Sequence, residues 1–146
     1  MSRQGASIII ERPPEEVFAF MDDISCECDW RPDLKSVTKE PEGPTQVGTH
    51  KHYVGEFLGN DLQNTYEVTE FEAGRRIVYQ TTKDSALKAT AELTCVGVED
   101  GTKVTMVIDA KPKGFLRLVP QRERDSAHLD QLKTALRCLK ECLESE

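Results

Sequence analysis

The C-terminal part of the chain carries the pattern that most restricts the fold. Between about Arg122 and Leu143, leucines recur at intervals of three and four residues, which is the spacing of one face of an α-helix. This stripe consists of Leu129, Leu132, Leu136, Leu139 and Leu143. At 1.5 Å per residue the helix would be roughly 30–35 Å long, enough to lie across a whole small domain. Such a helix needs an apolar surface to cover.

The preceding hundred residues supply that surface as β-structure. Alternation of apolar and polar residues, or runs of β-branched residues, predicts strands between recognisable turns. These strands span Ser7–Glu11, Leu34–Thr38, Val47–Leu58, Leu62–Phe71, Arg76–Thr82, Lys88–Val96 and Thr102–Ala110. Two short helices are expected over residues 14–21 and 24–28, because Pro14-Glu15-Glu16 suits a helix start and Asp22-Asp23 interrupts the pattern.

Consecutive strands joined by short turns favour an antiparallel sheet with one packed face and one face in water. We therefore predict an α+β fold in which a sheet of about six to seven strands packs on the long C-terminal helix. In such a fold the sheet and the helix can enclose a cavity between them. The length of 146 residues, without a linker or a repeat, predicts a single domain over residues 1–146.

Composition argues against several classes of partner. A net charge of −7 and a pI near 5.1 disfavour nucleic acid or an anionic membrane as default partners, and Lys and Arg are scattered along the sequence. Residues 1–6 resemble no secretory signal, and no apolar run is long enough to predict a membrane span. Five cysteines, an odd number, then predict reduced thiols and a cytoplasmic protein.

Several local motifs together resemble the START-like superfamily, specifically its polyketide cyclase/dehydrase and lipid-transport group. The segments that carry this resemblance are Ile8-Ile9-Ile10, residues 14–20 (PEEVFAF), residues 29–32 (DWRP), Val47-Gly48, residues 66–77 (YEVTEFEAGRRI) and residues 101–105 (GTKVT). They cover the chain from about Ala6 to Leu143. The resemblance implies a helix-grip fold: a curved antiparallel sheet wrapped on the C-terminal helix, enclosing a mostly apolar cavity. The family's members have diverse functions, so the resemblance implies no single chemistry.

Residues on the segments that the resemblance places around the cavity are the candidates for contact with a ligand. They are Trp30, Tyr53, Tyr66, Tyr79, Leu93, Met106, Leu129, Leu132 and Leu136. The tyrosines would offer rings for packing and hydroxyls for orienting a ligand oxygen. An equally simple interpretation makes each of them a core residue whose hydroxyl reaches the backbone or the surface. The small or flexible residues Ala89, Ala91 and Met106 would leave volume opposite the helix.

The strand around Tyr53 has two mixed faces, so its orientation stays open. His50 and His52 share one face and could approach a single metal, but no third ligand is visible nearby. Two histidines in water are the simpler interpretation. Lys51 and Arg76 are the strand cations that could meet an acidic ligand group. We predict neither a metal site nor a cofactor.

Two further clusters have ordinary structural explanations. The pairs Cys26/Cys28 and Cys138/Cys142 lack the loop setting of a zinc site, so buried thiols packing as small apolar groups are expected. Asp22, Asp23, Glu27 and Asp29 form an acidic cluster that could supply an acid–base pair, although a solvated helix edge is the more ordinary interpretation.

The sequence is compatible with three functions. The leading hypothesis is that the cavity binds a small apolar or aromatic ligand, such as a lipid, a polyketide-like molecule or a quinone-like molecule. One alternative is an enzyme of the polyketide cyclase or dehydratase type, which would need a titratable group inside the cavity. The other is a protein–protein interaction module with an exposed apolar patch at Phe57-Leu58. The chain is expected to be a monomer or a homodimer.

Overall fold

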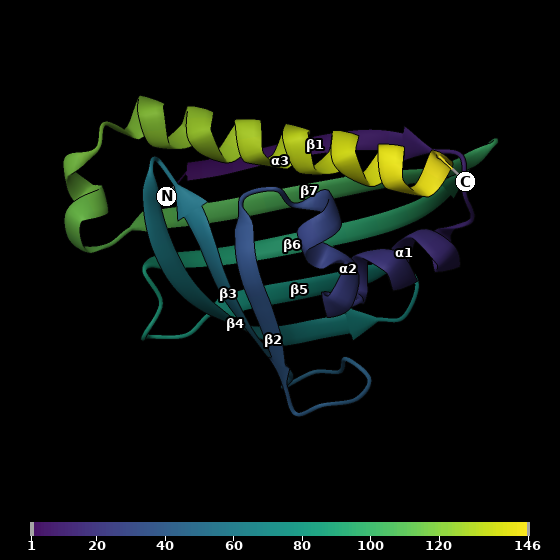
Figure 1. Ribbon diagram of the computed structural model, residues 1–146, viewed down its shortest axis with the longest axis horizontal. Helices are drawn as coiled ribbons and strands as arrows, with labels where there is room; N and C mark the ends of the chain where they lie inside the picture. Colours follow the sequence, from purple (N-terminus) through teal and green to yellow (C-terminus); the bar gives the residue numbers. More distant parts are fainter. Residues whose placement is uncertain (1, 146) are drawn as a thin grey trace.

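The computed structural model describes residues 2–145, which form one antiparallel sheet and three α-helices (Figure 1). The elements in chain order are β1 (Ser2–Ile10), α1 (Pro14–Asp22), α2 (Ile24–Trp30), β2 (Leu34–Glu40), β3 (His50–Phe57), β4 (Asn60–Glu72), β5 (Arg76–Thr81), β6 (Leu87–Val98), β7 (Gly101–Pro112), the short 3-10 helix η1 (Gly114–Leu118) and α3 (Gln121–Glu144). The predicted α+β helix-grip fold is confirmed, with seven strands and two short helices after the first strand.

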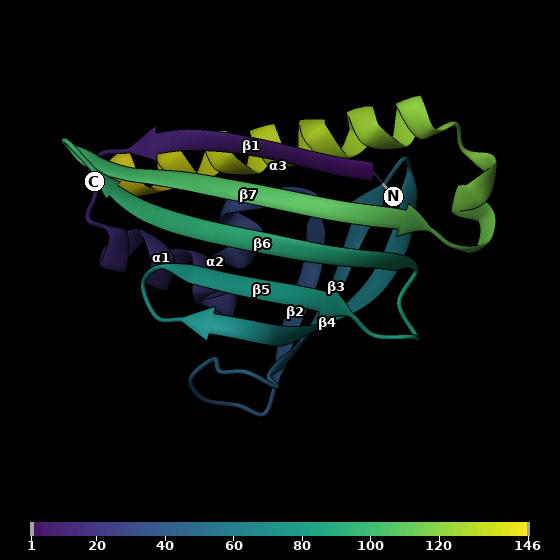
Figure 2. The same cartoon turned by 180° about the vertical axis from the view of Figure 1, so that it is seen from behind.

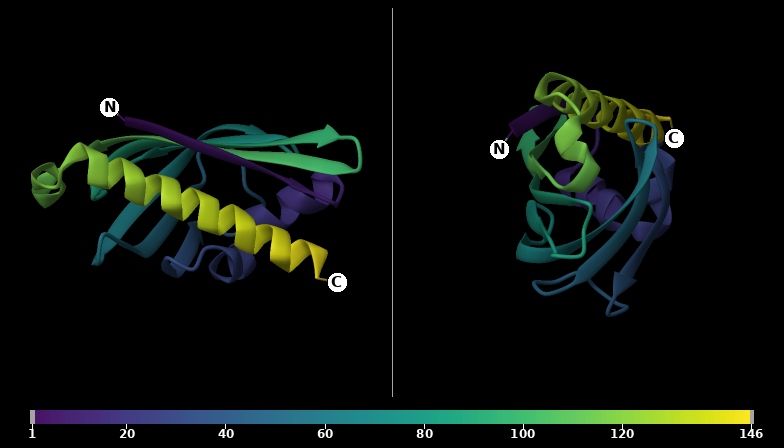
Figure 3. Two further views of the ribbon diagram at one scale, coloured as in Figure 1. Left: turned by 90° about the horizontal axis from the view of Figure 1, so that it is seen from above. Right: turned by 90° about the vertical axis from the view of Figure 1, so that its left-hand side faces the viewer.

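Strands β2 to β7 form a meander, and β1 pairs with β7 at one edge of the sheet. The strand order is β1-β7-β6-β5-β4-β3-β2, and every neighbouring pair is antiparallel. Strand β1 begins at Ser2, earlier than the expected Ser7, because residues 2–6 also pair in register with β7. The sheet curves, and α3 runs along its concave side beside β1 (Figure 1; Figure 3, right). Seen from behind, the outer face of the sheet carries no helix of the described chain (Figure 2).

The two short helices are separate because Asp23 ends one and caps the next. Its backbone N–H donates to the Ala19 carbonyl oxygen, and its carboxylate accepts from the Ser25 N–H at 2.9 Å. A side-chain oxygen at this position satisfies a donor that the first turn leaves free. The second helix therefore starts at Ile24 and continues to Trp30, two residues further than expected.

The hairpin between β3 and β4 turns one residue earlier than its Gly59-Asn60 signal suggests. Leu58 and Gly59 both have positive φ, at 53° and 80°, so they are the two central residues of the turn. Phe57 is therefore the last residue of β3, on the face that alternation makes inward. It is 5% exposed, so the expected apolar patch at Phe57-Leu58 is wrong for Phe57.

The apolar interior consists of a large and a small cluster of buried residues. The large cluster joins α1, α2, the sheet and the C-terminal half of α3, with Phe18, Trp30 and Leu139 among its members. The small cluster consists of Phe57, Leu62, Leu87 and Leu116. The candidate site lies in the region between the two. Within residues 2–145, no helix combines the length and the hydropathy that crossing a bilayer requires.

Candidate functional site

Two adjoining chambers lie between the sheet and the N-terminal half of α3. The inner chamber, of about 90 Å³, is bounded by α2, by the middle of the sheet and by Leu132 of α3. The outer chamber, of about 80 Å³, lies toward the β3–β4 hairpin, beneath His128 and Gln131 of α3. At about 30 Å³ per water molecule, each has room for about three waters. Four residues line both chambers and form the boundary between them: Arg31, Tyr53, Tyr66 and Ile108.

Three tyrosines on neighbouring strands form one wall of the inner chamber. Tyr53, Tyr66 and Tyr79 come from β3, β4 and β5, respectively. The rings of the first two meet edge to face at 5.7 Å, and the last two do so at 6.0 Å. Edge-to-face contacts are favourable for aromatic rings, so the three side chains support one another. A flat ring placed in the chamber would meet an aromatic surface.

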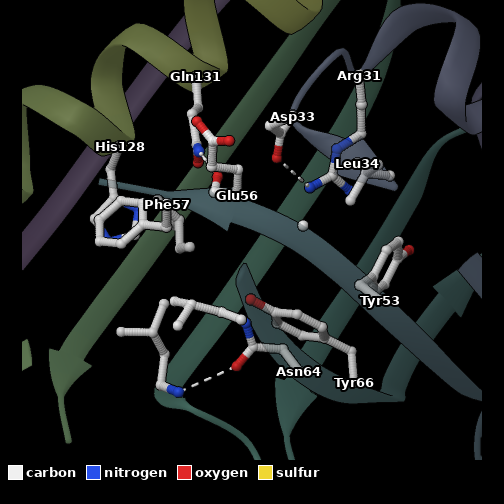
Figure 4. Close-up of a pocket in the computed structure, with 14 residues that line it drawn as sticks. Arg31, Asp33, Leu34, Tyr53, Glu56, Phe57, Asn64, Tyr66, His128 and Gln131 are labelled. Atoms are coloured by element: carbon white, nitrogen blue, oxygen red, sulfur yellow. Dashed lines mark hydrogen bonds and ion pairs between the residues drawn. The ribbon is translucent and has the colours of Figure 1, made fainter. Parts of the chain in front are cut away.

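Two donors beside the inner chamber make no hydrogen bond to any described residue. One is the buried indole N–H of Trp30, the last residue of α2. The other is the hydroxyl of Tyr66, whose ring reaches from β4 into the space between the sheet and the helix (Figure 4). Burial raises the Tyr66 pKa, so this hydroxyl keeps its proton. Both groups can donate to an acceptor that enters the cavity.

Glu27 places a carboxylate on the same wall. It is 3% exposed and lines the inner chamber. One of its oxygens accepts from the Tyr53 hydroxyl at 3.4 Å, and the other accepts from the Arg31 guanidinium at 3.3 Å. Burial raises the pKa of Glu27, whereas the positive charges of Arg31 and Lys51 oppose that effect. The site therefore contains a carboxyl group whose proton affinity is increased.

Lys51 carries a fully buried ammonium group behind this wall. Its Nζ donates to Asp22 Oδ1 at 2.9 Å and to the Tyr79 hydroxyl oxygen at 3.3 Å. Burial alone would lower the Lys51 pKa, but the oxygen-bearing groups around the ammonium outweigh that effect and raise it, so the group stays charged. Tyr79 loses its own proton less readily, because burial raises its pKa to about 12.

Arg31 separates the two chambers and links α2 to the sheet. Its guanidinium pairs with Glu27 and lies 3.9 Å from Asp33, and it sits 5.1 Å from the centre of the Tyr53 ring. The side chain is therefore held by two carboxylates and an aromatic face. A guanidinium at this boundary can bind an oxygen atom that approaches from either chamber.

The outer chamber is closed by contacts between α3 and the end of β3 (Figure 4). The His128 ring stacks on Phe57 with 4.4 Å between centroids. Gln131 donates from its amide nitrogen to the Glu56 carbonyl oxygen at 2.7 Å. Burial lowers the His128 pKa to about 4, so the ring is neutral near pH 7. Asn64, on the opposite wall, accepts from the Leu87 backbone N–H.

Seven of the nine residues singled out from the sequence line the inner chamber: Trp30, Tyr53, Tyr66, Tyr79, Leu93, Met106 and Leu132. Two do not. Leu136 is buried in the large apolar cluster, and Leu129 lines neither chamber. Of the small residues expected to leave volume, Ala91 lines the inner chamber, whereas Ala89 is packed elsewhere.

The polar members of the wall were not among the predicted site residues, although the sequence contained signals for them. Lys51 lies two residues before Tyr53, so an inward tyrosine on a strand requires an inward lysine. Glu27 lies three residues before Trp30 on α2, so the two share a helix face. Interpreting the acidic cluster as a solvated helix edge is therefore wrong for Glu27.

The open orientation of β3 is now settled, with Lys51 and Tyr53 inward and the two histidines on the other face. His50 lies near Glu67 and His52 near Glu40, each at less than 4 Å. No group of three or more potential metal ligands occurs among residues 2–145. Arg76 also faces away from the chambers and pairs with Glu70 and Glu92.

The cysteines of the described residues are all free thiols. Cys95 is buried in the large cluster, and burial raises its pKa to about 12, which suits an inert packing role. Cys138 and Cys142 pack beside the same cluster, as expected for small apolar groups. Cys28 is exposed and does not fit that expectation.

Comparison with known proteins gives a family match over almost the whole chain. The family described as polyketide cyclase / dehydrase and lipid transport matches residues 3–139. A search of curated proteins finds no match to the sequence.

Several solved structures share the fold. TTHA0849 from Thermus thermophilus superposes with a TM-score of 0.84 at 15% identity, covering 99% of this chain and 98% of that one. A START superfamily protein from Mycobacterium smegmatis gives 0.80 at 15% identity, covering 98% and 97%. The di-domain ARO/CYC BexL from the BE-7585A biosynthetic pathway gives 0.77 at 17% identity, covering 99% of this chain and 50% of BexL. At these identities the likeness concerns the fold alone.

Proposed function

The chain belongs to the polyketide cyclase / dehydrase and lipid transport family, and we propose that it binds a small aromatic ligand carrying oxygen acceptors. The observation that supports this proposal is the composition of the inner wall, which combines three tyrosine rings with two donors that lack a partner. Together the two adjoining chambers, of about 80 and 90 Å³, offer the space of about one aromatic ring. The ligand would therefore extend from the inner chamber past Arg31 toward the outer one.

The polar groups favour an oxygenated aromatic molecule over a plain acyl chain. A ligand carbonyl or phenol oxygen can accept from the Trp30 indole or from the Tyr66 hydroxyl. A hydrocarbon tail in the same place would leave both donors unpaired, and an unmade buried hydrogen bond costs about 1–3 kcal/mol. Polyphenols and quinones therefore match the wall better than fatty acids do.

Thermal unfolding with a ligand panel tests this proposal. The panel pairs naphthoquinones and polyphenols with fatty acids of similar size, each added to purified protein. A true ligand at one hundred times its dissociation constant should stabilise the fold by about 2.7 kcal/mol. Native mass spectrometry then gives the stoichiometry, expected to be one ligand per chain. If no oxygenated aromatic compound stabilises the protein, or if fatty acids do so equally, the proposed ligand class is wrong.

A matched pair of variants locates the binding. Tyr66→Phe removes one cavity hydroxyl and keeps the ring, and it should weaken binding of the best aromatic ligand about tenfold. Thr90→Val removes a hydroxyl from the exposed face of β6 and should leave affinity unchanged. Equal affinities for wild type and both variants would mean that the ligand binds elsewhere.

A second candidate function, an enzyme of the cyclase or dehydratase type, is favoured by Glu27. A buried carboxyl with a raised pKa, beside Arg31 and Tyr53, can remove a proton from a carbon next to a ligand carbonyl and return it to an oxygen. Arg31 and Tyr66 would hold the carbonyl oxygen, where negative charge develops.

Glu27→Gln separates this enzyme from a binding protein. Each bound aromatic ketone is incubated with protein, and the products are followed by mass spectrometry. The enzyme hypothesis predicts turnover by wild type and a loss of at least about 100-fold in Glu27→Gln, with ligand affinity nearly kept. If wild type leaves every bound compound unchanged, the enzyme hypothesis is wrong and only the binding function remains.

A further inference from the structure

The end of the molecule that carries η1 presents exposed apolar side chains on a short projecting turn. Phe115 is 51% exposed and Leu118 is 87% exposed, although both lie close to the fully buried Leu116 in sequence. Figures 1 and 3 show η1 extending beyond the end of the sheet. Leu118 has the highest exposed fraction of the exposed large apolar residues in the described chain. Apolar side chains held on a protruding turn suit insertion into an apolar medium.

The same stretch concentrates positive charge in an otherwise acidic protein. Residues 111–124, called the η1 segment below, contain five basic residues and one acidic residue, Glu123, in a chain of net charge −7. The basic residues are Lys111, Lys113, Arg117, Arg122 and Arg124. The scattered distribution of Lys and Arg inferred from the sequence therefore hides a local excess.

These five positive charges are not neutralised by the fold. No ion pair joins any of them to a described residue, whereas Lys35, Arg76 and Lys140 elsewhere each pair with a carboxylate. Lys113 instead donates to the carbonyl oxygens of Lys83 and Ser85, which ties the η1 segment to the β5–β6 turn. The segment is thus fixed in place, and its charge has no internal acidic partner within residues 2–145.

We propose that the η1 segment docks this end of the protein on the surface of an anionic lipid bilayer. Phe115 and Leu118 would enter the interface between headgroups and acyl chains, and the surrounding Lys and Arg would contact lipid phosphates. A bilayer is the partner that matches both features, because it offers an apolar layer directly beneath a negatively charged one. A protein partner would need a pocket for the two apolar side chains and acidic residues around it.

Docking here would bring the cavity close to the lipid surface. Leu116, between the two exposed apolar residues, packs with Phe57, Leu62 and Leu87 in the small apolar cluster. Those last three side chains also line the outer chamber. The bilayer contact and the outer chamber are therefore separated by one layer of side chains. The membrane proposal nevertheless stands on the η1 segment alone and does not depend on which ligand the cavity binds.

Co-sedimentation with vesicles tests the proposal on the 146-residue chain. Phosphatidylcholine vesicles with phosphatidylglycerol should bind the protein, and pure phosphatidylcholine vesicles should bind it much less. Binding should weaken as salt is raised, since the charges involved are exposed. Leu118→Asp should reduce binding at least about tenfold, and so should Arg117→Glu combined with Arg122→Glu. All of these positions are exposed, so the variants are expected to fold.

Matched controls separate a local contact from a general effect of charge. Val96→Asp replaces another exposed apolar residue on β6, near the β6–β7 hairpin at the opposite end of the molecule, and Arg137→Glu reverses an exposed charge on α3. Both should bind vesicles as wild type does. Absence of binding to phosphatidylglycerol vesicles at low salt would overturn the proposal, as would equal losses in the controls. If Leu118→Asp instead abolishes self-association seen by sedimentation, the η1 segment is a contact between copies of the chain and not a membrane surface.

Discussion

The two halves of α3 share one sequence pattern but face different surroundings. In the C-terminal half, Ala135, Leu136, Leu139 and Leu143 are buried in the large apolar cluster. In the N-terminal half, His128 and Gln131 line the outer chamber and Leu132 lines the inner one. The leucine stripe runs through both halves without a change of period. One half nevertheless covers a packed core and the other covers a cavity.

The difference comes from what each half meets. The C-terminal half packs with apolar residues of α1, α2 and β1, such as Phe18, Trp30 and Ile10. The N-terminal half lies over the curved part of the sheet, where Ala91 and Gly55 contribute little volume to the chamber walls. A helix face is therefore neither core nor cavity by itself, and the residues opposite decide which it becomes.

The largest test of this contrast removes one leucine from each half. Leu139→Ala should reduce the free energy of unfolding by about 2–5 kcal/mol, because Leu139 is completely buried and its removal leaves a void. Leu132→Ala should cost only about 1 kcal/mol, because part of the Leu132 surface already faces the chamber. Urea unfolding measures both values. Equal losses would contradict the view that the C-terminal half of α3 covers a packed core and the N-terminal half covers a cavity.

The pH dependence of stability tests the burial of His128, which lines the outer chamber in the N-terminal half of α3. The His128 pKa is lowered to about 4 in the folded protein, by burial with Arg124 adding to it and Asp125 opposing it. The unfolded chain therefore binds more protons between pH 6.5 and pH 4. The contribution of neutral His128 to the free energy of unfolding is therefore fully present above pH 6.5. It should be lost as the pH decreases through this window, by about 3 kcal/mol at most.

His128→Phe keeps a ring against Phe57 and removes the titration. Chemical unfolding at intervals between pH 4 and pH 6.5 should show a shallower decline for this variant than for wild type. Acidic residues titrate in both proteins, so the difference between the two curves isolates His128. Parallel curves would mean that His128 is not buried as a neutral ring.

Added volume should have opposite consequences in the two halves. Ala135→Leu inserts atoms into the packed cluster and should destabilise the fold by about 1–3 kcal/mol. Leu132→Phe places a larger side chain at the chamber wall and should change stability by less than about 1 kcal/mol while blocking ligand entry. Thermal melts with and without the best ligand measure both effects. A large loss in Leu132→Phe would show that the chamber has no spare volume.

The smallest effects should be the same in both halves. Each half has one side chain that donates to a strand carbonyl: Gln131 to Glu56 at 2.7 Å and Lys140 to Ile9 at 2.8 Å. Gln131→Ala and Lys140→Met should each cost about 0.5–1.5 kcal/mol in urea unfolding. Similar values would confine the contrast to apolar packing. A much larger cost for Gln131→Ala would mean that polar contacts, and not apolar packing, attach the N-terminal half of α3 to the sheet.

Prediction from the sequence succeeded where a pattern is local. The two-residue period of β6 and the three- and four-residue period of α3 gave the right elements, since each pattern needs one buried face. It failed where a single residue decided the outcome. The turn at Leu58-Gly59 lies one residue earlier than its signal, which buried Phe57. The polar wall was missed because Glu27 was assigned to a solvated helix edge and the orientation of the strand that carries Lys51 stayed open.

The sequence by itself determined the helix-grip fold and the inward phase of Tyr66 and Tyr79, because hydrophobic periodicity fixes which face of each element avoids water, whereas it left the orientation of Tyr53 open. Only the tertiary structure decided that Glu27 on the chamber wall lies 3.9 Å from the Lys51 ammonium behind it, and that half of α3 covers a cavity. Both depend on which residues from distant segments lie opposite one another. Ion pairing and packing are properties of such pairs, so no single stretch of sequence carries them.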